Sequence, residues 1–534
     1  MQNIIYKIMI GVFLTSMILS CDDFLDDMPD NRAELDTREK IAKLLVSAYA
    51  ETTYYRLAEF SSDNVDDHGN TFPLKSDLNE ELLYWKDAVA TDGNDNPVRV
   101  WAQNYTAISV ANTALQAIEE IGNADGSMNP LKGEALLCRA YCHFVLVNLF
   151  SLHYNPSTAS VDPGITYMEA PETTLNPQYK RNSVAEVYEK IERDILEGLP
   201  LISDAEYAVP KYHFNRNAAL AFAARFFLYK GEWEKVIKYA DELFVGNPAP
   251  FLRDWMAIVN YTSAPNDRAR KYIGADENAN FLIKTAYSNM GQYATGYTWS
   301  GRYRHGARLA EMETYYANAP WGYLSSTSQY KWPIATYNSA NQVSRLVPRM
   351  PYIFEYTDPV AGTGFYRTVT VEFWAEETLL SRAEAYIMLG RYNEALADVN
   401  LWRQNVTVSS LEFTVESANL FFNGINYYDG EGYKPTLKHK LNPASQLYDV
   451  SSDKTKENMI HLLLYCRRLE TLSQGLRWFD VKRWGIDIFR YTLDANSTVS
   501  DFANSVVKLP YDDPRRALQI PDDVLVAGYE PNPR

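Results

Sequence analysis

The sequence predicts a mostly α protein, a scaffold of tetratricopeptide-like helical hairpins with long irregular insertions and few short strands. Apolar residues recur at helical spacing through several long segments. Two of these segments share the small-and-aromatic spacing of a tetratricopeptide helix pair. In contrast, residues 248–371 lose the helical period and become rich in Tyr, Asn, Ser, Gly and Trp, and strand signals such as Thr368–Val371 are short and scattered.

The N-terminus has the pattern of a lipoprotein signal. Ile8–Leu19 is an apolar run that is too short for a permanent membrane span but suits the core of a signal peptide. It ends in Leu19-Ser20-Cys21, followed at once by acidic residues, as at the site that a bacterial lipoprotein peptidase cuts. We expect a signal peptide over 1–20, lipidation of Cys21 and a polar tether over 21–35; an unlipidated secretory signal is the alternative.

The region 36–247 is expected to be an N-terminal helical region with tetratricopeptide-like repeats. Asp36 and Glu39 suggest a capped first helix, and 54–97 is predicted to be rich in loops. Ser183 and Glu186 form a capping box that opens a later helix. The expected helices that follow the first cover residues 98–121, 130–150, 183–199, 217–229 and 232–245.

The region 248–534 is expected to follow as a C-terminal half, with the aromatic-rich insertion over 248–371 and closing helices. These helices are predicted at 372–389, 393–405 and 457–474, with an irregular stretch over 406–455. Gly390 and Gly231 occupy equivalent positions in the two repeat motifs, where glycine allows the tight turn between paired helices.

Composition excludes several classes of function. The formal charge of −17 argues against nucleic acid or anionic lipid as a partner, so membrane attachment would come from the lipid alone. Besides Cys21, the chain has Cys138, Cys142 and Cys466, and the first two are expected to be buried thiols on one helix.

No metal, cofactor or catalytic motif stands out. The seven His have no metal-ligand spacing, and the run Asp92–Asn96 starts like a calcium loop but continues with Pro97 where glycine is required. No cofactor is therefore expected, and bound calcium is not indicated. Nucleophile-elbow, Walker and dinucleotide motifs are missing from the sequence, although a pair of facing carboxylates cannot be identified from sequence alone.

Four segments of the chain resemble the SusD/RagB family of Bacteroidetes outer-membrane lipoproteins, and the resemblance extends over nearly the whole chain after residue 20. The segment Arg467–Gly485 is the most specific, and it departs from the family pattern at Ser473 and Gln474, on a helix expected to be structural. In this segment we expect Arg477 to pair with Asp480 on a short helix. The other matching segments are Cys21–Leu25, Gly133–Phe150 and Ala375–Ala385.

The resemblance implies a SusD-like fold and a non-enzymatic role: surface binding of oligosaccharide or polysaccharide and delivery to a SusC-like TonB-dependent outer-membrane transporter. The protein would then be lipid-anchored in the outer membrane and exposed on the cell surface. Three alternatives stay open: a peptide-binding lid of the same family, a surface glycosidase, and a scaffold that binds only protein.

Aromatic residues provide the candidate binding site. The chain has 39 Tyr, 22 Phe and 11 Trp, and sugar recognition needs flat rings with polar side chains beside them. The stretch 287–323 combines both and lies outside the repeats; the alternative is that its rings pack the insertion onto the scaffold. The candidate ligand-binding residues are Tyr293, Tyr297, Trp299, Arg302, Tyr303, Trp321 and Tyr323, with Trp85 near the Asp63–Gly69 loop as a second choice.

Overall fold

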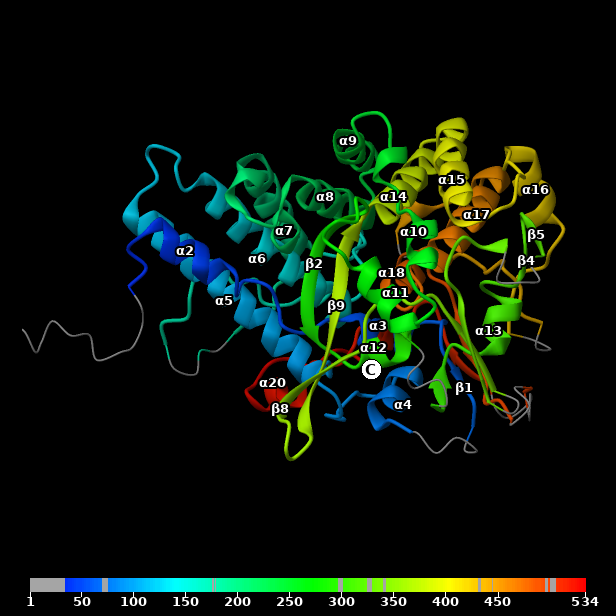
Figure 1. Cartoon of the computed structure of the whole chain (residues 1–534), viewed down its shortest axis with the longest axis horizontal. Helices are drawn as coiled ribbons and strands as arrows, with labels where there is room; N and C mark the ends of the chain where they lie inside the picture. The colour runs from blue at the N-terminus through cyan, green and yellow to red at the C-terminus, as the bar shows by residue number, and fades with distance from the viewer. Residues whose placement is uncertain are drawn as a thin grey trace, which may run out of the picture.

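The computed structural model shows two groups of helices on either side of a small twisted sheet, above a layer of loops (Figure 1). This arrangement confirms the predicted mostly α architecture. The structure describes residues 34–69, 75–174, 177, 179–295, 301–323, 329–339, 342–430, 434–443, 445–494, 498–499 and 506–534.

The first group contains α2 (Arg38–Leu45), α5 (Pro97–Ile121), α6 (Asn129–Phe150) and α7 (Val184–Gly198). Helix α6 is buried along most of its length because α5 and α7 both pack against it. The backbones of α6 and α7 come so close that a Cβ on Gly133 would lie 2.8 Å from the carbonyl oxygen of Gly198. The capping box at Ser183 forms as predicted, whereas the first helix is capped by Thr37 and not by Asp36.

Two helical hairpins confirm the predicted repeats. Helix α8 (Arg216–Lys230) turns into α9 (Trp233–Phe244), and α14 (Ala375–Met388) turns into α15 (Tyr392–Val406). The turn glycines, Gly231 and Gly390, have φ angles of 78° and 74°, a left-handed conformation that other residues adopt at a cost. The second hairpin packs on the first through α14 and α9.

The closing helices are α16 (Val415–Asn423), α17 (Lys454–Glu470) and α18 (Leu476–Arg483). Buried ion pairs hold α18 against its neighbours. Asp480 accepts from Arg467 of α17 at 3.0 Å and from Arg483 of its own helix at 2.7 Å, and Arg483 reaches Glu384 of α14 at 2.5 Å. The predicted pairing of Arg477 with Asp480 is wrong, because the Arg477 side chain bonds Asp63 at 2.8 Å and leaves Asp480 to the other two arginines.

The main sheet has the strand order β2-β9-β8, all antiparallel, with β2 at Asn280–Tyr287, β9 at Thr363–Trp374 and β8 at Ile353–Asp358. Strand β9 is longer than the signal at 368–371 suggested, and it includes Glu372–Trp374, which were expected to start a helix. The short strand pairs are β1 (Asp66–Asp67) with β3 (Tyr303–Arg304), β4 (Asn318–Ala319) with β5 (Gly322–Tyr323), β6 (Ala335–Ser339) with β7 (Gln342–Leu346), and β10 (Ile488–Arg490) with β11 (Val507–Leu509).

Short helices fill segments that were predicted as irregular. They are too short to show a hydrophobic period, so their sequences resemble loops. These helices are α3 (Tyr55–Ser61), α4 (Asp77–Leu83), α10 (Trp255–Tyr261), α11 (Pro265–Tyr272), α12 (Met290–Ala294) and α13 (Ala307–Met312), and α16 likewise lies in the stretch 406–455 that was predicted as irregular. A further short helix, α20 (Asp522–Val526), lies near the end of the chain.

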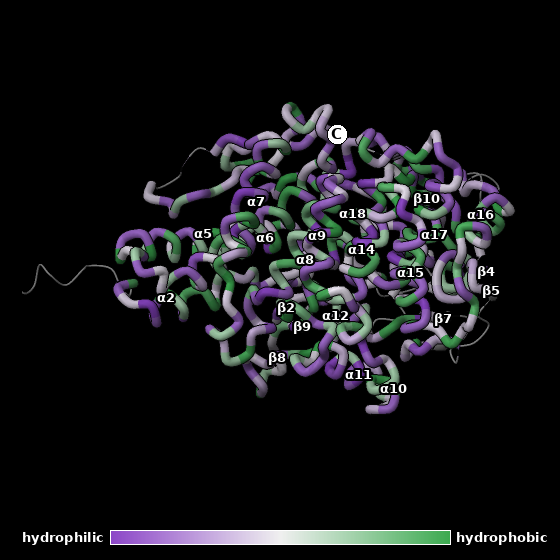
Figure 2. Tube along the Cα trace, turned by 90° about the horizontal axis from the view of Figure 1, so that it is seen from above, coloured by the Kyte–Doolittle hydropathy of each residue, from purple (hydrophilic) through white to green (hydrophobic). Residues whose placement is uncertain are grey.

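One hydrophobic core runs between the two groups of helices. The hydrophobic segments of α8 and α14 lie toward the middle of the molecule in Figure 2. Cys138, Cys142 and Cys466 are buried free thiols, as expected for the first two. Among the described residues, no helix is both long and apolar enough to cross a membrane.

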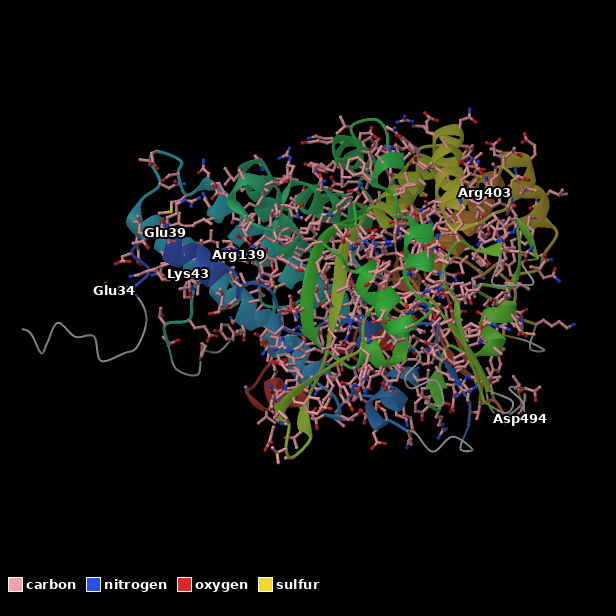
Figure 3. The ribbon with its side chains drawn as sticks, in the orientation of Figure 1. Glu34, Glu39, Lys43, Arg139, Arg403 and Asp494 are labelled. Atoms are coloured by element: carbon pink, nitrogen blue, oxygen red, sulfur yellow. The ribbon has the colours of Figure 1, made fainter. Side chains whose placement is uncertain are left out.

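Buried arginines occur in both groups of helices. Arg139 and Arg403, labelled in Figure 3, lie in the left and right halves of the molecule, respectively. Arg139 bonds both carboxylate oxygens of Asp194, at 2.6 and 2.9 Å, and so ties α6 to α7. Arg403, at the end of α15, donates to the carbonyl oxygen of Ser409.

We predict that Asp480→Asn lowers the free energy of unfolding by about 3–5 kcal/mol at pH 7, because Arg467 and Arg483 lose a buried carboxylate partner. Burial opposes ionisation of Asp480, but the two arginines outweigh it and lower its pKa. A carboxylate with a lowered pKa stabilises the fold above its unfolded pKa of about 4 and loses that effect as pH falls. Urea unfolding should therefore show a difference between variant and wild type that is complete at pH 7 and shrinks below about pH 4.

The matched control is Glu394→Gln, which removes a surface pair with Arg391 at 3.0 Å. Both side chains of that pair are about half exposed, so its loss should leave the unfolding midpoint nearly unchanged. Equal destabilisation by the two substitutions would contradict the role assigned to Asp480.

Candidate functional site

Pairing of β1 with β3 brings part of the predicted aromatic stretch next to the Asp63–Gly69 loop. Asp66 lies opposite Arg304, and Asp67 lies opposite Tyr303. The stretch that contains β3 was the first choice from sequence, and β1 lies in the Asp63–Gly69 loop, near which the second choice, Trp85, was placed. Helix α4 completes the arrangement at the lower edge of Figure 1. We call Asp67, Glu80, Tyr84, Arg302 and Tyr303 the β1–β3 cluster.

A buried carboxylate organises one side of this cluster. Asp67 is fully buried, and its two oxygens accept from Nε and Nη2 of Arg302 at 2.6 and 2.8 Å. The hydroxyl of Tyr84 donates to the same carboxylate at 2.6 Å. The bond to Asp67 raises the pKa of Arg302, whereas burial and the same negative charge raise the pKa of Tyr84. Arg302 is thus fixed as a cation at the surface end of the pair.

Glu80 organises the other side. Its carboxylate accepts from the Tyr303 hydroxyl at 2.7 Å and pairs with Lys75 at 2.8 Å and Lys86 at 3.0 Å. The hydrogen bond from Lys75 is the main reason that the pKa of Glu80 falls to about 2, with smaller contributions from Tyr303 and Lys86. Because both lysines are exposed, the rim of the cluster presents hydrogen-bond donors to solvent.

Tyr293 lies beside the cluster on α12. Its ring meets Phe60 edge-on at 5.0 Å, and its hydroxyl accepts from Asn79 of α4 at 2.7 Å. In the same part of the fold, Arg56 donates to Asp92 at 2.9 Å and to Asp95 at 3.0 Å. The acidic run that starts like a calcium loop therefore holds an arginine.

Trp85 is a core residue in this structure. It is 3% exposed, and its indole nitrogen donates to the carbonyl oxygen of Ser61 at 2.9 Å. The guanidinium of Arg490 lies 5.1 Å from its ring centroid. The φ angle of Trp85 is +52°, which is strained for a bulky residue and shows how firmly these contacts hold it.

Trp321 lies away from the cluster, next to β4 and β5 at the right of Figure 1. It is 5% exposed and packs on Tyr465, Phe413 and Trp402 with ring centroids 5.2, 5.8 and 6.2 Å apart. Its ring faces are therefore occupied by other aromatic rings, as the packing alternative proposed.

Three predicted rings remain, and the structure describes the backbone of one of them. Tyr323 lies in β5 opposite Asn318. Tyr297 and Trp299 lie outside the described residues, so their role in binding stays a prediction. In all, the structure brings Tyr293, Arg302 and Tyr303 together beside the buried Trp85.

Sequence reasoning missed three members of the cluster. Asp67 lay in a loop that had been noted, but Glu80 belongs to a helix too short to predict, and Tyr84 directly follows that helix. Asp67 and Arg302 are 235 residues apart, and a single sequence carries no sign of such a pairing.

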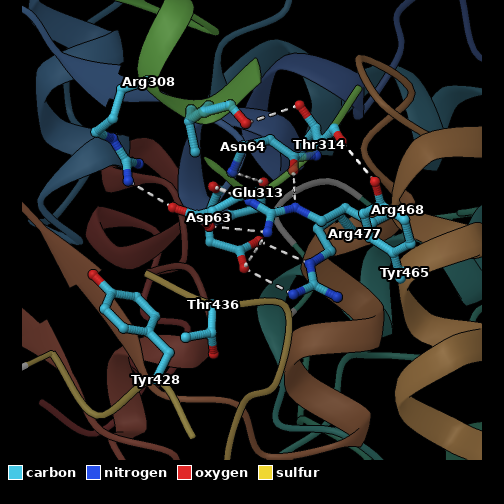
Figure 4. A network of polar contacts seen from close by, with 12 residues as sticks. Asp63, Asn64, Arg308, Glu313, Thr314, Tyr428, Thr436, Tyr465, Arg468 and Arg477 are labelled. Carbon is cyan, nitrogen blue, oxygen red and sulfur yellow. Dashed lines mark hydrogen bonds and ion pairs between the residues drawn. The ribbon is translucent and has the colours of Figure 1, made fainter. Parts of the chain in front are cut away.

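A layer of buried charges lies behind the cluster (Figure 4). Asp63 accepts from Arg477 at 2.8 Å and lies 3.7 Å from Arg468, which itself pairs with Glu313 at 3.0 Å. Arg308 then joins Glu313 to Asp66, with both contacts at 2.6 Å. Although burial opposes it, Arg468 and Arg477 hold the pKa of Asp63 well below its usual range.

Potential metal-ligating atoms of Asp63, Glu313 and His439 lie within 4.8 Å of one another in this layer. Each of the two carboxylates already bonds a guanidinium, and a cation placed among them would be repelled by the arginines. The donor set suits an ion-pair layer, and it does not fit a metal ion.

The described residues also line two larger cavities. One, of about 560 Å³, lies between α5 and α20 and is mainly apolar, with Trp101, Tyr105 and Tyr529 among its lining residues. The other, of about 530 Å³, is lined by rings and charged groups from residues 427–508. Among the described residues, the predicted rings of the stretch 287–323 line neither cavity, so ring content alone did not reveal these hollows.

Comparison with known proteins connects this geometry with one family. A family model described as "Starch-binding associating with outer membrane" matches residues 23–228, and one described as "SusD family" matches residues 266–521. A curated relative, SusD-like protein P2 from Formosa agariphila, is 27% identical over 169 residues, which are 30% of this chain and 30% of that protein. The match thus spans under a third of the curated relative's length.

Solved structures show the same fold over nearly the whole chain. A SusD superfamily protein from Bacteroides vulgatus has a TM-score of 0.61 at 18% identity and covers 92% of this chain and 97% of its own. A SusD-like carbohydrate binding protein from the same organism has a TM-score of 0.57 at 16% identity, covering 92% and 96%. A SusD superfamily protein from Bacteroides thetaiotaomicron has a TM-score of 0.57 at 18% identity, covering 92% and 98%.

We predict that Trp321→Ala lowers the free energy of unfolding by about 3–5 kcal/mol, because it leaves a cavity among three aromatic rings. Tyr356→Ala is the control, since Tyr356 on β8 is 58% exposed and should contribute little. Chemical denaturation of both variants measures the difference; a Trp321 variant as stable as the control would contradict the core position.

Proposed function

Because this chain belongs to the SusD family, we propose that it captures oligosaccharide or polysaccharide at the cell surface and delivers it to a SusC-like TonB-dependent transporter. Carbohydrate binding at the level of the family is supported by the starch-binding family model and by the carbohydrate-binding neighbour of the same fold. The delivery step and the transporter partner extend that family role to this chain.

The observation that carries the proposal for the site is the β1–β3 cluster. Arg302 and the lysines around Glu80 offer donors for sugar hydroxyls, and the carboxylates behind them keep these donors charged and oriented. A rigid, preorganised set of polar groups is what a carbohydrate site requires, because it limits the entropy lost on binding.

Tyr297 and Trp299 are the rings proposed to stack on the sugar. Trp299 precedes Arg302 by three residues, so the chain keeps their Cα atoms within about 11 Å of each other. By analogy with other aromatic contacts, each stacked ring contributes about 0.5–1.5 kcal/mol. A few rings together with the polar groups then correspond to a dissociation constant of roughly micromolar to millimolar.

We propose that Cys21 is the lipid attachment site and that the acidic residues behind it direct the protein to the outer face of the outer membrane. The apolar run over 8–19 and the family model described as associating with the outer membrane support this placement. No catalytic step is proposed.

We predict saturable binding of at least one polysaccharide in calorimetric titrations against starch, xylan, pectin, yeast mannan and mucin glycans. Trp299→Ala should weaken that binding about two- to tenfold, since it removes a proposed stacking ring worth about 0.5–1.5 kcal/mol. The matched control is Tyr356→Ala, which truncates an exposed ring on β8 and should leave affinity unchanged.

Each other outcome has a definite meaning. Binding that survives Trp299→Ala keeps the function and contradicts this placement of the site. Binding of matched peptides without any glycan contradicts the glycan proposal in favour of a peptide-binding lid, and release of reducing ends from a bound polysaccharide contradicts a purely binding role.

We predict that Cys21→Ser moves the protein from the outer-membrane fraction to the soluble fraction of cells, because the acyl chains would supply most of its membrane affinity. Fractionation and metabolic labelling with a palmitate analogue test this, with Cys466→Ser, a change at a buried thiol, as the control. Labelling that persists in the Cys21 variant would overturn the assignment.

A further inference from the structure

The cavity of about 530 Å³ lies between the chain around Tyr427, the N-terminal part of α17 and β10. Helices α16 and α17 and strand β10 mark this part of the molecule at the right of Figure 2. Its volume is in the range of sites that enclose small ligands. In the part of the chain that the structure describes, neither the predicted site residues nor the β1–β3 cluster contributes to its lining.

Tyr427, Tyr428 and Phe489 contribute aromatic rings to its walls. Tyr427 is 37% exposed, and Phe489 on β10 is half-buried. The Phe489 ring lies tightly against the backbone of Gly430, where an added Cβ would come within 2.2 Å of Cδ1. Lys438 and Lys508 lie over the Tyr427 and Phe489 rings at 4.5 and 5.4 Å, respectively. The rings are therefore held in place before any ligand arrives.

Charged groups of both signs surround these rings. Asp487 pairs with Lys508 at 2.7 Å, and Glu457 pairs with Lys454 at 2.8 Å and accepts from the Tyr427 hydroxyl. Burial alone would raise the pKa of Glu457, but His461 at 3.5 Å and hydrogen bonds from Lys454 and Tyr427 lower it to about 2. The cavity thus offers carboxylate acceptors and ammonium donors at fixed positions.

His439 lies between the cavity and the buried charge layer. It is 8% exposed, and its Nδ1 has no hydrogen-bond partner in the part of the chain that the structure describes. Burial, helped by Arg477 and Arg468, lowers its pKa to about 4 against the opposing charges of Asp63 and Glu313, so the ring is neutral at pH 7. An unpaired polar atom at such depth costs free energy that a ligand hydroxyl or a water could recover.

These features select one class of ligand. An apolar ligand would leave the carboxylates and His439 without new partners. An anion would meet Asp429, Asp449, Glu457 and Asp487 against two lining lysines, Lys440 and Lys508. A neutral polyol ring suits the whole set, since its C–H face packs on an aromatic ring while its hydroxyls both donate and accept.

We propose that this cavity is a second carbohydrate-binding site, in which Phe489 and Tyr427 contact a sugar ring and the charged groups of the wall bond its hydroxyls. The ligand class rests on the proposed function, whereas the position of the site rests on the cavity alone. Sites of this kind suit a short oligosaccharide or one segment of a longer chain.

Strand β10 relates the two sites. Arg490 donates to the carbonyl oxygens of Val65 and Leu83, next to the β1–β3 cluster, while its neighbour Phe489 lines the cavity. Successive side chains of a strand point to opposite faces. The two sites therefore lie on opposite sides of one rigid element, and a polymer that reaches both would bind more tightly than a fragment that fills one.

The test is calorimetric titration of the purified protein with the polysaccharide that binds most tightly in the panel above and with its short oligosaccharides. We expect two oligosaccharides per wild-type chain and one per chain for Tyr427→Ala. Affinity for the polymer should fall at least tenfold in the variant, because the second attachment is lost. Tyr356→Ala, at an exposed ring of the same type, is the control.

A second variant, Ser451→Trp, tests the same cavity in case Tyr427→Ala fails to fold. Ser451 is exposed on the cavity wall, so a bulky side chain there should block the cavity while the aromatic packing stays intact. Stoichiometry unchanged in both variants would overturn the second site and leave the proposed function standing. If no glycan in the panel binds the wild-type protein, both proposals fail together.

Discussion

The pairing of Asp63 with Arg468 and Arg477 is the interaction on which the arrangement of this protein depends. It joins a loop near the start of the chain to two helices near its end, across 414 residues in the case of Arg477. Buried charges of this kind are favourable only when each is fully paired, since desolvation costs several kcal/mol per ion. Arg308 and Glu313 complete the pairing, so the loop has one low-energy position.

That position determines where the candidate site forms. Asp66 forms an ion pair with Arg308 of the buried charge layer, and its neighbour Asp67 forms one with Arg302 of the β1–β3 cluster. Because adjacent residues of a strand point to opposite faces, one short strand connects the buried charge layer to the polar cluster. The same layer borders the cavity through His439. Both proposed sugar sites thus rest on a single layer of paired charges, which gives them a rigid support.

The sequence predicted the parts of this fold whose signals are local. Ser183 and Gly231 marked a helix start and a helix turn because capping and left-handed turns depend on neighbouring residues. Arg477 and Trp321 were misjudged because their partners, Asp63 and Trp402, lie far away in the chain. Of the site, the aromatic stretch was predicted but Asp67 in the acidic loop was not, and the contact of the two through β1 and β3 required the folded chain.

The long reach of Asp63 has a consequence for biosynthesis. At ~5–20 residues per second, roughly 20–80 s separate the synthesis of Asp63 from that of Arg477, 414 residues later. Throughout this interval the carboxylate lacks its permanent partner and stays hydrated, so the segment around it cannot settle into its native place. A product that terminates before α17 and α18 lacks both arginines, so the segment around Asp63 does not reach its native position. The buried charge layer therefore forms only in a chain that contains these two helices.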